Sequence, residues 1–187
     1  MENKTPDFGF NVQRILDCGF QIEEAIDPNP DNTLISYGMG FYFDIEKNWV
    51  QFNLRADFVK EEKQIFATGT VLTKFGIQNL QSFADENGDV NWPPNALETM
   101  FGIAFSHMRA MMCKNLAGTR FSNFIVPLVN PASMFKQLIE RDPLYNAEKI
   151  KLPTNSETKS EKKNEELLEK AIKKQKQKIK KPKKQPN

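Results

Sequence analysis

His107 is the first residue to consider for chemistry, because it is the single histidine of the chain. Ser106 and Arg109 flank it, but a nucleophilic triad also needs an acid that orients the imidazole. No acidic residue stands at a helical spacing from His107. The sequence therefore predicts a partly exposed helix histidine without a catalytic or metal-binding role.

The two cysteines, Cys18 and Cys113, form no recognisable pairing pattern. This usage is typical of a reducing compartment, and it predicts no disulfide framework. Cys113 lacks a nearby cysteine that could resolve an oxidised intermediate. We therefore expect Cys113 to be a buried or half-buried thiol without redox chemistry.

The acidic loop at residues 85–89 superficially resembles a calcium site. An EF-hand loop needs glycine at its sixth position and glutamate at its twelfth, whereas Gly88 is at the fourth position when Asp85 is the first. Neither glycine-rich phosphate-binding motif occurs, and no local pattern places two carboxylates for acid–base work. The sequence predicts a solvated loop, no metal, no cofactor and no enzymatic activity.

The expected helical segments after residue 96 are rich in methionine and phenylalanine. Met100, Met108, Met111 and Met112 share one stretch with helical spacing, and Met134 opens the next such stretch. Two interpretations stay open: a core packed with adaptable side chains, or an adaptable contact surface for partners.

Four segments alternate between apolar and polar residues with the two-residue period of β-strands. They span residues 10–23, 33–46, 49–60 and 64–75. One face of the first is expected to carry Phe10, Val12, Leu16, Cys18, Phe20 and Ile22. One face of the fourth is expected to carry Ile65, Ala67, Gly69, Val71, Thr73 and Phe75. Short polar turns at 46–48 and 61–63 make neighbouring strands antiparallel.

Two helices are expected after the strands. Pro93 and Pro94 suit a helix start, apolar residues then recur at steps of three and four from Leu97 to Met112, and Gly118 follows the expected end. Asn130 and Pro131 begin a shorter helix with Met134, Phe135, Leu138 and Ile139 on one face. The predicted fold class is α+β: a four-stranded antiparallel meander followed by one long and one short helix.

Charge divides the chain into an acidic body and a basic tail. Residues 153–187 carry 12 lysines and 5 glutamates, a net charge of +7, whereas residues 1–152 have a net charge of −5. We expect a disordered tail over 153–187. No apolar signal segment or membrane-length run is visible, so a cytoplasmic protein without membrane insertion is expected.

Several local motifs resemble the SecB family of protein-export chaperones. The segment 10–15 (Phe-Asn-Val-Gln-Arg-Ile) resembles the opening strand of that family, and 53–56 (Asn-Leu-Arg-Ala) resembles its third strand. The segment 127–130 (Pro-Leu-Val-Asn), with Phe135 five residues on, is similar to the approach to its last helix. The long helix with Arg109 near its middle also fits. The resemblance covers about residues 8–140 and predicts a chaperone domain over 8–145.

What the resemblance implies is a cytoplasmic holdase that forms homotetramers, built as dimers of dimers. Its first strand and long helix would make the subunit contacts. Unfolded, secretion-bound chains would bind an apolar groove between sheet and helices and pass to the SecA ATPase. Acidic residues on the exposed sheet face would contribute to SecA docking. Glu23 matches one such position, but Gly69 stands at another, and the long basic tail replaces a short acidic one.

The client-binding groove is predicted to include the following side chains: Tyr37, Phe41, Phe43, Phe52, Phe58, Phe135 and Leu138. The wide helical stripe exceeds what one sheet face needs, so Phe105, Met108 and Met112 are predicted at a subunit interface. Two alternatives remain: a SecB-like chaperone for non-secreted clients such as an antitoxin, and a nucleic-acid or ribosome-associated protein that acts through its tail. The body lacks a basic stripe with interleaved aromatic residues, which counts against nucleic-acid recognition.

Overall fold

The computed structural model describes residues 7–60 and 64–141. Its strands are β1 (Phe10–Ile22), β2 (Leu34–Asp44), β3 (Trp49–Lys60) and β4 (Gln64–Ile77). Its helices are α1 (Ala96–Leu116) and α2 (Pro131–Arg141), with short 3-10 turns at Pro30–Asn32 and Leu80–Phe83. The chain divides into two units, Met1–Leu152 and Pro153–Asn187, and every described residue belongs to the first. The predicted tail therefore lies outside the described residues.

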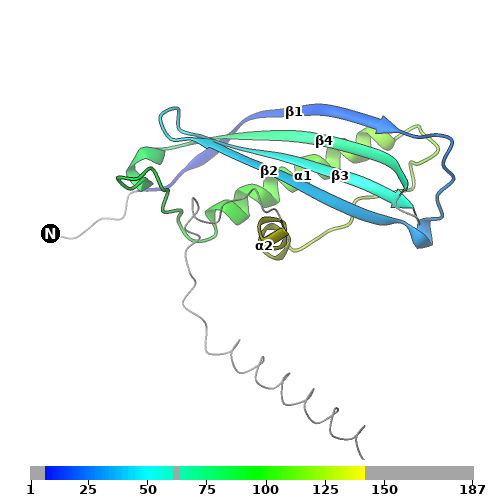
Figure 1. Ribbon diagram of the computed structural model, residues 1–187. Coiled ribbons are helices and arrows are strands. Elements are labelled where there is room, and N and C mark those ends of the chain that lie inside the picture. Colours follow the sequence, from blue (N-terminus) through cyan, green and yellow to red (C-terminus); the bar gives the residue numbers. More distant parts are fainter. Residues whose placement is uncertain (1–6, 61–63, 142–187) are drawn as a thin grey trace, which may run out of the picture. The chain divides into compact units, whose positions relative to one another are not determined.

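The strands form one antiparallel sheet in the order β1-β4-β3-β2 (Figure 1). The predicted fold class, a four-stranded antiparallel sheet with one long and one short helix, is confirmed. The expected simple meander is wrong for β1, which pairs with β4 instead of β2. The reason is the long connection between β1 and β2, which crosses to the far edge of the sheet. Arg120 holds this connection by donating to the backbone carbonyl of Glu24 and pairing with Asp27 at 2.5 Å.

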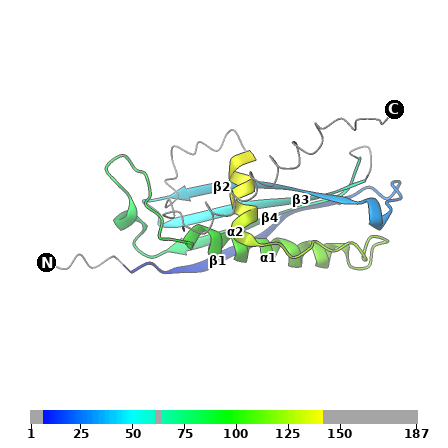
Figure 2. The same cartoon turned by 90° about the horizontal axis from the view of Figure 1, so that it is seen from below.

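Both helices cover the same face of the sheet (Figures 1 and 2). α1 runs along the strands, whereas α2 lies across them near β2 and is seen end-on in Figure 1. We call the covered face the inner face and the opposite one the outer face. No described helix is long and apolar enough to cross a membrane.

The core lies between the inner face of β3 and β4 and the helix α1. Alternate residues of β3 are buried there, namely Val50, Phe52, Leu54, Ala56 and Phe58. They meet the buried stripe of α1, which includes Met100, Phe101, Ala104, Phe105, Met108 and Met112. Burial of this apolar surface, at about 25 cal/mol per Å², is the main force that orders the sheet and the helix together.

Two irregularities in β1 change which side chains face inward. The register with β4 shifts between Val12 and Arg14 and again between Asp17 and Gly19, so each β-bulge adds one residue to β1. Between the bulges Ile15 and Asp17 are therefore on the inner face, where Asp17 accepts a hydrogen bond of 2.7 Å from Asn115 of α1. Leu16 and Cys18, which strict alternation placed inward, are exposed.

A third β-bulge, at the start of β4, changes which of its residues face inward. The register with β3 shifts at Val59, which pairs with Ile65, whereas Phe58 pairs with Ala67. Phe66 is buried at this bulge against Phe121, with ring centroids 5.2 Å apart. Ile65, predicted on the inner face, instead has 43% of its surface exposed.

Candidate functional site

The inner face of β2 carries a continuous row of large apolar side chains that the protomer covers only in part. We call it the β2 row; its members are Ile35, Tyr37, Met39, Phe41 and Phe43, and all are half-buried. Their partners on β3 are fully buried, because β3 lies inside the sheet whereas β2 pairs with no other described strand. Burial therefore decreases from the core to the edge of the sheet and leaves the row half-buried.

The β2 row rests on rigid aromatic packing. The ring centroid of Phe41 lies 5.0 Å from that of Phe52 and 6.3 Å from that of Trp92. Phe43 meets Trp92 edge-on at 6.1 Å. Tyr37 packs against Phe105 of α1 at 5.5 Å. Buried side chains thus fix the rotamers of the row, which makes it a preformed apolar surface.

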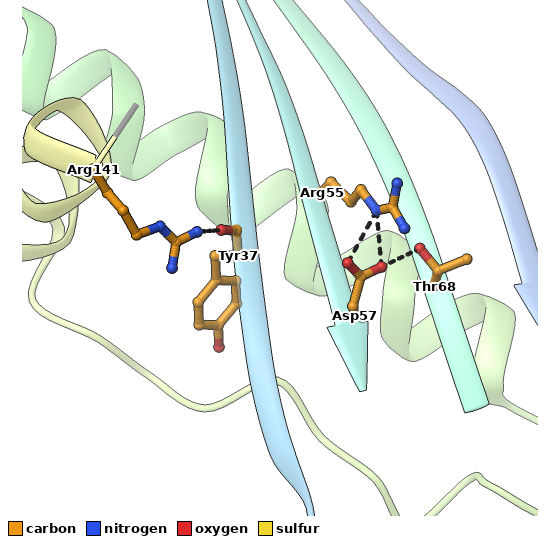
Figure 3. A network of polar contacts seen from close by, with 5 residues as sticks. All are labelled: Tyr37, Arg55, Asp57, Thr68 and Arg141. Carbon is orange, nitrogen blue, oxygen red and sulfur yellow. Dashed lines mark hydrogen bonds and ion pairs between the residues drawn. The ribbon is translucent and has the colours of Figure 1, made fainter. Parts of the chain in front are cut away.

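Helix α2 closes one side of this surface. Phe135 is buried between Phe52 and Phe101, at centroid distances of 6.2 Å and 5.4 Å. At the end of the helix, the guanidinium of Arg141 donates a hydrogen bond to the backbone carbonyl of Tyr37 (Figure 3). α2 is therefore tied to the edge strand near the N-terminal end of the row.

Two polar groups in this region have no hydrogen-bond partner among the described residues. They are the hydroxyl of Tyr37 and the indole nitrogen of Trp92, and both atoms are buried. Desolvation raises the pKa of Tyr37, and the positive charge of Arg109 opposes that rise. Each unpaired buried donor costs free energy, so these two groups lower the stability of the packing beneath the row.

The loop between α1 and α2 adds exposed apolar side chains. Leu128 is 83% exposed and Ile125 is 63% exposed. Between them Val126 is buried, and its carbonyl accepts a 3.0 Å hydrogen bond from Nε of Arg109. Arg109 therefore fixes a loop whose apolar tips point to solvent.

The structure separates the predicted groove residues into two groups. Tyr37, Phe41 and Phe43 belong to the half-buried β2 row. The others, Phe52, Phe58, Phe135 and Leu138, are buried inside the protomer. Their burial leaves them no surface for a partner, so they support the row from beneath. Sequence reasoning omitted the exposed Ile125 and Leu128, although two apolar residues around a proline in an expected loop were a visible signal.

The predicted interface residues also lie in the core. Phe105, Met108 and Met112 are at most 5% exposed and pack against the sheet. A Cβ atom at Gly69 would overlap the sulfur of Met112, so this glycine allows α1 to approach β4 closely. Gly69 lies on the inner face, where an acidic side chain could not reach a docking partner. Glu23 is exposed just after β1.

The other residues considered for chemistry are His107, the two cysteines and Asp85, and none of them is part of a catalytic or metal-binding group among the described residues. Nδ1 of His107 lies 3.2 Å from the hydroxyl of Thr73, a buried polar residue of the sheet, and desolvation lowers the pKa of the histidine. Both thiols are exposed and form no disulfide, which corrects the expectation that Cys113 is covered. Asp85 accepts hydrogen bonds from the backbone of Asn87 and Asp89. The described residues contain no group of three metal-ligating side chains.

The outer face contrasts with the β2 row in its chemistry. Asp57 pairs with Arg55 at 2.8 Å and accepts a hydrogen bond from Thr68, all on this face (Figure 3). Farther along, the ammonium of Lys74 lies 4.2 Å from the centre of the Trp49 ring. These contacts make part of the outer face polar, whereas Leu34 and Tyr42 of β2 are exposed elsewhere on it.

No family model matches the sequence, and no curated protein matches it. Among solved structures, the fold is similar to that of a SecB-like chaperone of Mycobacterium tuberculosis, solved in complex with a ChAD peptide from an antitoxin. The identity is 10% and the TM-score is 0.45, over 64% of this chain and 90% of that one.

Proposed function

We propose that this protein is an ATP-independent holdase chaperone that binds unfolded polypeptides along the β2 row. The observation that carries the proposal is a continuous, half-buried apolar row on an edge strand, above a packed aromatic core. Monomeric proteins seldom leave such a surface uncovered without a use for it. The protein is a binding protein under this proposal, and it catalyses no reaction.

Binding would combine two physical contributions. Client apolar side chains would be buried against Met39, Phe41 and Phe43, at about 25 cal/mol per Å² of apolar surface removed from water. An extended client could also pair its backbone with the edge of β2, as peptides do when they add a strand to a sheet. Both contributions depend little on client sequence, which suits a chaperone.

In its more specific form, the proposal is that the protein acts in the cytoplasm on polypeptides destined for secretion. It would keep them unfolded and pass them to the Sec translocase. Glu23 would then contribute to SecA docking, without help from an acid at position 69. In the alternative form the client is not secreted, and an antitoxin is one example. A secretion assay separates the two, because loss of the protein would leave precursors unprocessed in the first form only.

We also propose that the protein self-associates, with a tetramer as the expected form. The buried Phe105 and Met108 cannot supply the contact, so the support comes from exposed apolar side chains on the edge strand β1. These are Val12, Ile15 and Leu16, each 38–40% exposed. Light scattering on the purified protein gives the mass, and a monomer at micromolar concentration would rule out this part of the proposal.

The experiment that tests the holdase proposal is suppression of aggregation without nucleotide. Several chemically unfolded clients are diluted into buffer with and without the protein, and turbidity is followed. We expect stoichiometric protection for clients of unrelated sequence. Protection of none of them, or protection only with ATP, would overturn the proposal.

The second candidate, nucleic-acid or ribosome binding through the Lys-rich tail, has support from the charge of residues 153–187 alone. On the described body, the cation Arg55 is paired with Asp57 and Lys74 lies on Trp49. Two cations of the outer face are thus already engaged, and residues 1–152 carry a net charge of −5, which disfavours a phosphate backbone. The holdase is therefore the better-supported function.

A further inference from the structure

We propose that residues 144–152 of the same chain cover the β2 row and compete there with clients. The competition rests on the proposed holdase function, whereas the covering itself does not. The occupant is thus a segment of this chain that immediately follows the described residues.

The chain leaves the described structure beside the β2 row. The last described residue, Arg141, is hydrogen-bonded to the backbone of Tyr37, the second of the five members of the row. Leu144 follows only three residues later. The local concentration of this segment at the row is therefore far higher than that of any free client.

The apolar residues beyond Arg141 are unevenly distributed along the chain. The segment 144–152 holds Leu144, Tyr145, Ile150 and Leu152, whereas the stretch 153–166 contains no large apolar residue. Apolar side chains are thus concentrated beside the surface that needs a cover. The Lys-rich remainder of the tail has the composition of a solvated chain.

The segment 144–152 also matches the β2 row in length. The segment 144–152 and the β2 stretch 35–43 each contain nine residues, so an extended segment spans the whole row at roughly 3.3 Å per residue. Backbone groups of alternate β2 residues point to the same side as the carbonyl of Tyr37, because N–H and C=O of one residue in an antiparallel strand point the same way. An extended segment can therefore add apolar and backbone contacts together.

The consequence is a self-limiting binding surface. A client must displace the segment, so the apparent affinity equals the affinity of the open row multiplied by the fraction of time that the row is open. If the segment covers the row nine-tenths of the time, its removal strengthens client binding about tenfold. The row would also be shielded from aggregation when no client is present.

The test compares two variants of the full-length chain. In the first, four serines replace the apolar residues of the segment: Leu144→Ser, Tyr145→Ser, Ile150→Ser and Leu152→Ser. In the matched control, four serines replace apolar residues of the distant tail: Leu167→Ser, Leu168→Ser, Ile172→Ser and Ile179→Ser. Hydrogen exchange of the β2 amides reports the cover, and anisotropy with fluorescein-labelled, carboxymethylated α-lactalbumin reports client binding.

In the first variant, we expect faster exchange along β2 and several-fold tighter binding of the labelled protein; in the control, neither should change. Unchanged exchange in the first variant would overturn the covering. Faster exchange with unchanged affinity would overturn the competition. If no version binds the labelled protein but exchange still rises, the holdase function fails while the covering stands.

Discussion

Gly69 is the residue at which one added carbon would disturb the packing of β4 against α1. Because a Cβ atom there overlaps the sulfur of Met112, we expect Gly69→Ala to lower the free energy of unfolding by roughly 1–3 kcal/mol. Gly38→Ala is the matched control, since its Cβ would lie 3.8 Å from Cβ of Arg55 on the outer face. There the change should be neutral or stabilise by up to about 1 kcal/mol.

Urea unfolding of the two alanine variants gives the comparison. Equal stabilities would mean that α1 can move away from β4 without cost. That outcome would contradict the close approach of the helix to the sheet at Gly69.

His107 should make stability depend on pH in a defined direction. Burial lowers its pKa in the folded protein, so the unfolded chain takes up a proton at higher pH than the folded protein does. The free energy of unfolding should therefore fall as pH drops below about 6.5, until the folded protein is protonated too. Above that pH the contribution should be constant.

The comparison is with His107→Gln, which does not titrate but can still hydrogen-bond to Thr73. Thermal or urea unfolding of both proteins between about pH 5 and 7 isolates the histidine, because acidic groups change both curves equally. Parallel stability curves over this range would contradict the account of His107.

At the scale of elements, alternation and helical spacing in the sequence predicted all four strands and both helices. They could not predict the three bulges, because an extra residue such as Cys18 changes which residues face inward without breaking the local alternation of apolar and polar residues. Nor could they place β1 beside β4, which the long connection permits but the local sequence does not require.

The candidate site was predictable in part for a related reason. Periodicity put Tyr37 and Phe41 on the same face as Phe52 and Phe58, and the register confirms that they share it. Exposure, however, depends on whether a strand lies at the edge or inside the sheet. Phe52 is buried because β3 is internal, whereas Phe41 is half-buried because β2 is an edge.

Phe135 should contribute strongly to the attachment of helix α2, which Leu138, Ile139 and Arg141 also support. Phe135 packs between Phe52 and Phe101, so we expect Phe135→Ala to cost about 3–5 kcal/mol through the cavity that it leaves. Lys136→Ala, the next residue and an exposed one, should change stability by less than about 0.5 kcal/mol. Denaturant unfolding measures both, and a small loss for Phe135→Ala would show that α2 is not part of the cooperative fold.

At the scale of the whole molecule, the basic tail should tune partners without supporting the fold. We expect deletion of residues 153–187 to leave the thermal midpoint and the light-scattering mass unchanged. Affinity for anionic partners should fall, most clearly at low salt, because screening acts over about 8 Å at physiological ionic strength. A large drop in the thermal midpoint would place the tail inside the fold and move the domain boundary.

The most direct measurement for the whole account is photo-crosslinking from the β2 row to an unfolded client. Met39→p-benzoylphenylalanine places the probe in the row, and Ser36→p-benzoylphenylalanine places it on the outer face of the same strand. After irradiation with a carboxymethylated, unfolded client, we expect crosslinks from position 39 and few from position 36. Equal crosslinking from both positions, or crosslinking from position 36 alone, would contradict binding along the β2 row.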